Sequence, residues 1–325
     1  MLEPFRNALI LTGPTGSGKS ALALELGPLL NAEIIAMDSM TLYRGMDVGT
    51  AKPTVADRAR VPHHLIDVLD PWESANVAWW LEQAAQACRA IEARGRWPLF
   101  VGGTPFYLKA LVHGLFASPP ASPAVRQHLE AEADKQGRDT LHSRLATVDP
   151  ATAARLHPND LRRVVRALEV YELTGKPISA WQQQGWWDAA QKGPLAGQGT
   201  DQPPRCLVVD VPRTELYARI DRRVEAMMAA GWVEEVRRLR LLPRPLGKEA
   251  SQAVGYREVG EFLDGRREFA ETVALIQMRT RQYAKRQLTW FRHLRGCIPC
   301  EPKLTFDRWV GKMDTSGLTD GKTVQ

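Results

Sequence analysis

The chain has 325 residues, of which 44% are hydrophobic and 25% charged, the balance of a folded globular protein rather than a disordered one. A net charge of +6 and a pI of about 9.2 favour a polyanionic partner. The four cysteines are too few for a disulfide scaffold, and no stretch approaches the ~18 apolar residues of a membrane span. Because no apolar leader precedes the first motif, we expect a cytoplasmic protein with reduced thiols and no membrane partner.

The first motif is GPTGSGKS, residues 13–20, which follows an apolar run and precedes a helix-forming segment. In this pattern, glycine-rich backbone and a helix N-terminus supply N–H groups to phosphate oxygens, the lysine reaches the outer phosphates and the final hydroxyl binds Mg²⁺. We therefore expect Ser20 to bind the metal. The residues expected to bind a diphosphate or nucleotide are Gly13, Pro14, Thr15, Gly16, Ser17, Gly18, Lys19 and Ser20. The motif alone does not distinguish ATP from another diphosphate.

Four short apolar runs predict parallel strands that are covered by helices on both faces: residues 8–12, 33–37, 98–101 and 206–211. Helical segments separate these runs. The sequence therefore predicts an α/β fold, a P-loop doubly wound parallel sheet.

Residues 117–204 interrupt this alternation between the third and fourth runs. They read as helices between two borders rich in proline and glycine, which indicates an inserted, mainly helical domain. We thus expect a discontinuous core, residues 1–116 and 205–310, around this insertion. The final residues, 311–325, have little to bury and are expected to be a disordered tail.

Polar residues follow the predicted strands at the edge where α/β folds bind ligands. Asp38 ends the second run, and from its position it is a candidate Mg²⁺ ligand, general base or helix N-cap. The Gly-Gly-Thr sequence at 102–104 lets a ligand or another segment approach the backbone closely. The HHLID segment, 63–67, has no common metal-site spacing, so we interpret its histidines as packing residues.

The segment 278–295 carries six arginines and lysines and no acid. Read as a helix, it places basic residues near one face and apolar residues on another. The basic set is Arg281, Lys285, Arg292 and Arg295, and the apolar set is Ile276, Tyr283, Trp290 and Leu294. A one-signed face of this kind predicts phosphate contacts. The insertion adds Arg162, Arg163 and Arg166, and a WQQQGWW segment whose tryptophans we interpret as core or interface residues.

Seven segments together resemble bacterial tRNA dimethylallyltransferases, members of the isopentenyl-transferase group: GPTGSGKS, DSMTLYRGMDVGTAKP, HHLID, VGGTPFYLKAL, DPATAARLHPNDLRRVVRALEVYELTGKP, AVGYREV and TRQYAKRQLTWFR. The resemblance extends from residue 8 to about residue 295. It implies transfer of a dimethylallyl group from dimethylallyl diphosphate to N6 of the adenosine 3′-adjacent to the anticodon of tRNA. The implied partner is the anticodon stem-loop, and we expect a monomer.

The resemblance also implies roles for individual residues. Asp38 corresponds to the general base, and Thr104 and Arg126 lie near the reacting centre. The residues implied to contact tRNA are Asp38, Ser39, Met40, Thr41, Thr104, Arg126, Asn159, Asp160, Leu161, Arg162, Arg163, Gln252, Gly255, Tyr256, Arg257, Arg281, Gln282, Lys285 and Arg286.

Two other functions use the same phosphate loop. A small-molecule or nucleoside kinase would place ATP there and use Asp38 or Asp210 for the metal or the substrate hydroxyl, but it has no need of a basic helix. An RNA-binding switch ATPase would need that helix together with nucleotide turnover. Consumption of ATP with a small acceptor identifies the kinase, and a response of tRNA binding to ATP identifies the switch.

Overall fold

The computed structural model describes residues 3–115, 119–183, 205–294 and 297–301. The chain divides into two compact units, one formed by Met1–Val112 with Pro194–Gln325 and the other by His113–Gly193. Several predicted features lie outside the described residues: the borders of the insertion at 117 and 204, the last two tryptophans of WQQQGWW, Arg295 and the tail 311–325. Those features stay predictions.

The first unit is built on a six-stranded sheet of order β3-β2-β4-β1-β5-β6, in which every neighbouring pair is parallel. Its strands are β1 (Leu9–Thr12), β2 (Ala32–Ala36), β3 (His63–His64), β4 (Trp97–Gly102), β5 (Cys206–Val209) and β6 (Ile298–Cys300). The predicted α/β class and the four predicted strands are confirmed. The two edge strands, β3 and β6, were not predicted, because two or three residues without a continuous apolar run give no strand signal.

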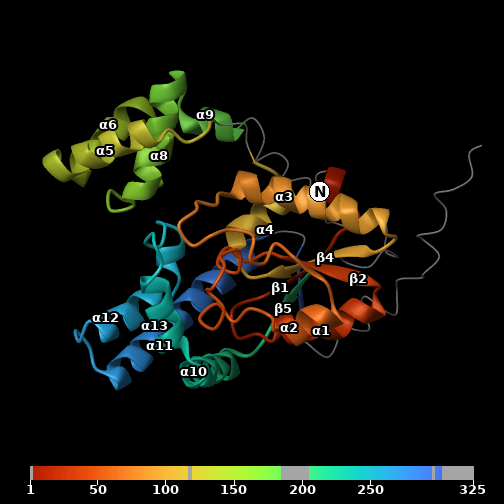
Figure 1. Ribbon diagram of the computed structural model, residues 1–325. Helices are drawn as coiled ribbons and strands as arrows, with labels where there is room; N and C mark the ends of the chain where they lie inside the picture. Colours follow the sequence, from red (N-terminus) through yellow and green to blue (C-terminus); the bar gives the residue numbers. More distant parts are fainter. Residues whose placement is uncertain (1–2, 116–118, 184–204, 295–296, 302–325) are drawn as a thin grey trace, which may run out of the picture. The chain divides into compact units, whose positions relative to one another are not determined.

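Helices cover both faces of this sheet, with α3 and α4 on one side and α1 on the other (Figure 1). The unit contains η1 (Glu3–Phe5), α1 (Lys19–Leu29), α2 (Val55–Arg60), α3 (Val77–Ala93), α4 (Pro105–His113), α10 (Arg213–Ala229), α11 (Trp232–Arg240), η2 (Ala250–Gln252), α12 (Tyr256–Leu263) and α13 (Phe269–His293). Successive residues of β1 point to opposite faces of the sheet. Ile10 belongs to the hydrophobic core that contains Trp80, and Leu11 to the core that contains Leu26. Within the described ranges, no helix is long and apolar enough to cross a membrane.

A buried carboxylate organises the long segment between β2 and α2. Glu235 of α11 accepts hydrogen bonds from the N–H groups of residues 47–49 at 2.6–3.1 Å and from the Tyr256 hydroxyl at 2.7 Å. Lys52, also buried, pairs with Asp67 at 2.6 Å. These bonds hold an irregular segment in one conformation, because a buried acceptor or charge is costly without its partners.

The histidines of the HHLID segment have structural partners. His64 Nε2 lies 2.6 Å from the buried carboxylate of Glu33, which also accepts from Arg94 at 2.7 Å. His63 Nδ1 lies 2.6 Å from the Val61 carbonyl oxygen. These contacts agree with the packing interpretation.

The described elements of the second unit are all helices: α5 (Pro123–Gln136), α6 (Arg138–Val148), α7 (Pro150–Ala153), α8 (Leu161–Thr174) and α9 (Ile178–Gln183). Their apolar faces meet in one core that includes Leu129, Leu141, Leu145, Val164 and Leu168. The helical character predicted for the insertion is therefore found in this unit.

One fully buried acid, Glu169 of α8, lies in the second unit with a side-chain exposure of 0%. Its carboxylate accepts from Arg126 at 2.9 and 3.0 Å, from Arg166 at 2.6 Å and from the Ser122 N–H at 2.7 Å. Burial acts to raise the pKa of Glu169, but these hydrogen bonds outweigh it and leave the pKa below the ordinary 4.5.

The depressed pKa of Glu169 gives a pH dependence with a defined sign. A carboxyl group with a lower pKa in the folded state stabilises fully above its unfolded pKa, and the stabilisation is lost as the pH falls through the folded pKa. We expect Glu169→Gln to lower stability by about 2–3 kcal/mol at pH 7, since it removes the charge that two arginines face. The difference in melting temperature between variant and parent should shrink below pH 4.5. A pH-independent difference would contradict this account.

Candidate active site

The phosphate loop leads from the end of β1 to the first turn of α1. Thr12 Oγ1 donates to the Gly102 carbonyl at 2.8 Å, which ties the strand end to β4. Gly18 takes a left-handed conformation, φ 89°, at the N-cap of α1. Without a side chain from the described residues capping it, α1 presents its first N–H groups and the positive end of its dipole to the loop.

Two side chains of the loop, Lys19 and Ser17, have surroundings that suit an anion. Lys19 Nζ donates to the Pro14 carbonyl at 3.3 Å, and burial and the nearby Arg223 lower its pKa to about 8. Ser17 is fully buried, and its hydroxyl has no hydrogen-bond partner among the described residues. A bound diphosphate would supply the negative charge that Lys19 faces and acceptor oxygens for the loop.

Asp38 and Thr104 lie side by side at the ends of β2 and β4. The Asp38 Oδ1 atom accepts the Met40 N–H at 2.9 Å, and Thr104 Oγ1 accepts the Ser39 N–H at 3.1 Å. The carboxylate of Asp38 also acts on Lys19, whose pKa it raises against the effect of burial. The structure therefore brings Asp38, Thr104 and the phosphate loop together. No α-helix begins at Asp38, since α2 starts only at Val55, so its carboxylate caps a turn instead.

Arg223 and Tyr283 belong to this cluster and were missed by sequence reasoning. Burial lowers the pKa of Arg223 and the Asp38 carboxylate raises it, which places this guanidinium near both Asp38 and Lys19. Burial, followed by the Asp38 charge, raises the pKa of Tyr283, whose hydroxyl interacts with the Thr104 side chain. A signal for Arg223 existed, because it lies three residues after the buried Ile220 on α10 and so borders the packed face.

The basic segment forms the C-terminal half of α13. Its predicted faces are found at most positions: Ile276 and Leu294 are buried, while Lys285 and Arg292 are exposed. Arg281 differs, since it is partly buried and forms an ion pair with Asp221 of α10. Its charge is therefore already balanced, and in the described part of the segment the exposed arginines and lysines are Lys285, Arg286 and Arg292.

The other residues implied to contact tRNA have diverse surroundings. Gln252 and Arg257 are exposed, although Arg257 pairs with Glu261 at 3.0 Å. Tyr256 is buried and donates to Glu235, and Gly255 lies against the ring of Trp232. Their tRNA contacts stay predictions.

In the second unit, Asp160 precedes α8 and pairs with Arg163 at 2.9 Å, while Asn159 and Arg162 are exposed. Arg126 forms the ion pair with Glu169 described above. Its assignment to the reacting centre stays a prediction.

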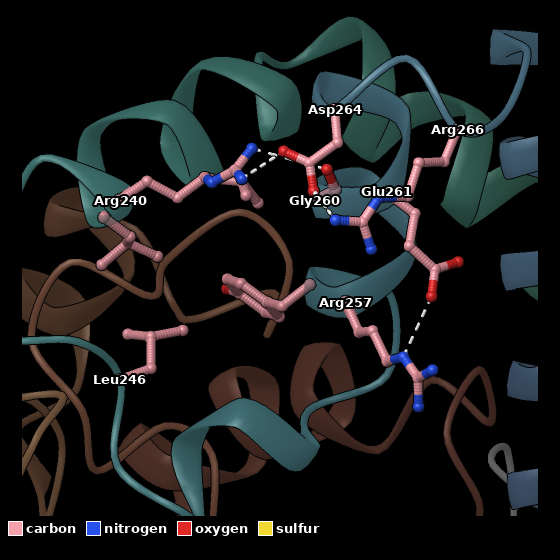
Figure 2. Close-up of a pocket in the computed structure, with 10 residues that line it drawn as sticks. Arg240, Leu246, Arg257, Gly260, Glu261, Asp264 and Arg266 are labelled. Carbon is pink, nitrogen blue, oxygen red and sulfur yellow. Dashed lines mark hydrogen bonds and ion pairs between the residues drawn. The ribbon is translucent and has the colours of Figure 1, made fainter.

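A pocket of 290 Å³ lies beside α11 and α12. Its lining residues come from the segment 236–266, and none belongs to the phosphate loop. Figure 2 shows that its arginines point toward acids: Arg240 pairs with Asp264, and Arg257 with Glu261 at 3.0 Å. The remaining arginine, Arg266, lies 3.5 Å from Asp264. Because its cations are neutralised, this pocket is a weaker anion site than the phosphate loop.

Comparison with known proteins gives relatives that match almost the whole chain. A Geobacter metallireducens protein named tRNA dimethylallyltransferase is 46% identical over 315 residues, which cover 96% of each chain. A Pelobacter propionicus protein named tRNA dimethylallyltransferase 1 is 47% identical over 285 residues, which cover 87% of this chain and 88% of that one.

Solved structures with a similar fold carry similar names. The full-length tRNA isopentenylpyrophosphate transferase of Bacillus halodurans is 36% identical, with a TM-score of 0.63 over 94% of this chain and 93% of that chain. A eukaryotic dimethylallyltransferase acting on tRNA is 26% identical, with a TM-score of 0.73 over 92% of this chain and 75% of that chain. Residues 41–294 also match the family model described as IPP transferase. The chain therefore belongs to the IPP transferase family.

Proposed function

We propose that the protein transfers a dimethylallyl group from dimethylallyl diphosphate to N6 of the adenosine 3′-adjacent to the anticodon of tRNA, and so produces N6-dimethylallyladenosine. The observation that carries this proposal is the juxtaposition of a phosphate loop with Asp38 and Thr104 at one edge of the sheet. Support comes from relatives named tRNA dimethylallyltransferase and from a structural neighbour whose title describes action on tRNA.

The phosphate loop stabilises the leaving group. As the C1–O bond of the allylic substrate breaks, negative charge accumulates on the departing diphosphate. N–H groups of the loop and the ammonium of Lys19, which donates to the Pro14 carbonyl at 3.3 Å, would stabilise this charge. Arg223, which lies near Lys19, adds a second cation to the same end of the site.

The residues at the loop fit a magnesium ion that is held mainly by the substrate. Ser20 is exposed in the first turn of α1, directly after Lys19. Among the described residues, no group of three acids, histidines or cysteines could hold a metal by itself. Mg²⁺ commonly takes one or two protein oxygens and completes its shell with phosphate oxygens and water, so we propose that Ser20 is its protein ligand. The ion would neutralise charge on the diphosphate.

Asp38 acts on the nucleophile. The exocyclic N6 of adenine is a weak nucleophile, because its lone pair is delocalised into the ring. As the N6–C1 bond forms, N6 must lose a proton, and the Asp38 carboxylate accepts it. The hydrogen bond from the Met40 N–H orients this carboxylate at 2.9 Å, and a carboxylate has further acceptor positions for the amine.

The tRNA is bound by the exposed basic residues of α13 and by residues of the second unit. Lys285, Arg286 and Arg292 supply positive charge along one stretch of α13, and Asn159 and Arg162 are exposed at the start of α8. We further propose that the protein acts as a cytoplasmic monomer, with Arg126 reaching the reacting centre when tRNA is bound.

Incubation with unmodified tRNA and dimethylallyl diphosphate tests the proposed function. We expect nucleoside mass analysis to show an adenosine that has gained one C5H8 unit, and fragment sequencing to place it directly 3′ of the anticodon. If the tRNA stays unmodified and the protein consumes ATP in the presence of a small acceptor, the kinase alternative is favoured instead.

The role of Asp38 predicts the effect of a single substitution. Asp38→Asn keeps an oxygen that can accept the Met40 N–H but cannot take up the proton of N6. We expect kcat to fall about 100-fold or more, while tRNA affinity and melting temperature stay close to those of the parent. Single-turnover kinetics with saturating substrates measure this. A kcat near that of the parent, or full rescue by added Mg²⁺, would exclude the general-base role.

The exposed part of α13 predicts a salt dependence. Each phosphate contact contributes roughly one unit to the slope of log affinity against log salt concentration, so Lys285→Ala with Arg286→Ala should flatten the slope by about 2. Filter binding of tRNA at several salt concentrations measures it. The matched control is Arg60→Ala with Arg89→Ala, which removes two exposed charges from α2 and α3. Equal slopes for both double variants would mean that α13 is no phosphate-binding surface.

A further inference from the structure

Gln287 is a polar residue on the packed face of α13. Only 2% of it is exposed, and its neighbours on that face are Ile276, Ala284 and Phe291. A primary amide at such a position costs free energy unless its oxygen and nitrogen find hydrogen-bond partners. The identity of those partners shows what the residue does.

Both ends of the Gln287 amide bond to the active site. Its Oε1 accepts the Thr15 N–H of the phosphate loop at 2.9 Å, and its Nε2 donates to the Gly103 carbonyl of the Gly-Gly-Thr turn at 2.6 Å. One side chain of α13 therefore joins two segments that are 272 and 184 residues away from it in sequence.

Each of these hydrogen bonds is made to one polar group of a planar peptide unit. The other polar group of the same unit makes a hydrogen bond that positions a proposed active-site residue. The Thr15 N–H belongs to the same peptide plane as the Pro14 carbonyl, which accepts from Lys19 Nζ at 3.3 Å. The Gly103 carbonyl belongs to the same plane as the Thr104 N–H, which donates to the Met37 carbonyl at 3.3 Å. Gln287 thus orients the peptide groups that set the positions of Lys19 and Thr104.

The Gly-Gly-Thr turn is shaped to receive this amide. A Cβ atom added at Gly103 would lie 2.6 Å from Gln287 Nε2 and 3.0 Å from the Gly13 carbonyl oxygen. No side chain fits there without displacing one of them. The glycine is therefore required by the close approach of α13 and the phosphate loop.

We propose that Gln287 is a positioning residue for the transfer reaction, which holds the phosphate loop and the Gly-Gly-Thr turn in the arrangement that binds diphosphate and couples that arrangement to tRNA binding by α13. The inference rests on the proposed function. The coupling follows from the placement of Gln287 within one turn of the exposed Lys285 and Arg286. Any adjustment of α13 to RNA is passed through the amide to both peptide groups, so each ligand changes the affinity for the other.

Gln287→Met tests the proposal, because methionine has a similar length but makes neither hydrogen bond. The measurements are calorimetric titrations with inorganic pyrophosphate and Mg²⁺, with and without an anticodon stem-loop RNA. In the parent, RNA should raise pyrophosphate affinity severalfold. In the variant we expect about 10-fold weaker pyrophosphate binding, loss of most of the effect of RNA, and RNA affinity within about 2-fold of the parent. The KM for dimethylallyl diphosphate should rise, and the KM for tRNA at saturating dimethylallyl diphosphate should rise by no more than the severalfold coupling that is lost.

A matched control and a second variant keep the test specific. Gln277 lies on the same helix and donates to the Asp221 carbonyl at 3.3 Å and to Glu225 at 3.2 Å, away from the loop. Gln277→Met should bind pyrophosphate as the parent does. Gly103→Ala displaces the amide of Gln287 and also meets the Gly13 carbonyl oxygen at 3.0 Å, so it should weaken pyrophosphate binding at least as much as Gln287→Met does.

Two outcomes would overturn the inference. In one, Gln287→Met binds pyrophosphate like the parent and keeps the effect of RNA. In the other, pyrophosphate and RNA affinity fall equally with the melting temperature, and Gln277→Met behaves the same way, so that the amide only stabilises the fold. Failure of the proposed function can be distinguished from both outcomes. In that case the parent protein itself would not prenylate tRNA, whatever the behaviour of Gln287→Met.

Discussion

The parallel register of β2, β4 and β1 is the constraint on which the site depends. Ile34 of β2 lies opposite Leu99 of β4, which lies opposite Leu9 of β1, so the three strands reach the same edge of the sheet. The loops that follow them therefore begin at neighbouring points. This arrangement puts a phosphate loop, a carboxylate and a hydroxyl close together, although the chain separates them by many residues.

Two positively charged side chains lie close together at this edge of the sheet and repel each other. Lys19 and Arg223 lie near each other in partly buried surroundings, and each has a lowered pKa. Asp38 is the carboxylate that opposes this effect on both cations. A bound diphosphate would relieve this repulsion more fully, and the relief would favour its binding. The proposed roles of Asp38 as counter-charge and as base are compatible, because both need it ionised.

Buried polar side chains hold the irregular segments around the site. Glu235 ties the segment after β2 to α11 and α12, Gln287 ties the phosphate loop to α13, and Glu169 organises the helices of the second unit. In each case a side chain on a helix satisfies several groups from distant segments. If one hydrogen-bond partner is lost, the remaining polar groups stay buried without a partner and out of reach of water, which costs free energy. These contacts therefore restrict the segments to few conformations.

Local patterns in the sequence determined the phosphate loop, the four central strands and most of the two-sided character of α13, because glycine spacing, apolar runs and helical periodicity act within a few residues. The roles implied for Asp38 and Thr104 came from resemblance, and the structure places the two together. The signal for Arg223 was missed, and the site roles of Tyr283 and Gln287 could not be predicted. Arg281 was read only as a free cation rather than as the partner of Asp221. A polar residue on a packed helix face is defined by the groups that meet it there, and only the tertiary fold brings those groups from segments up to 272 residues away.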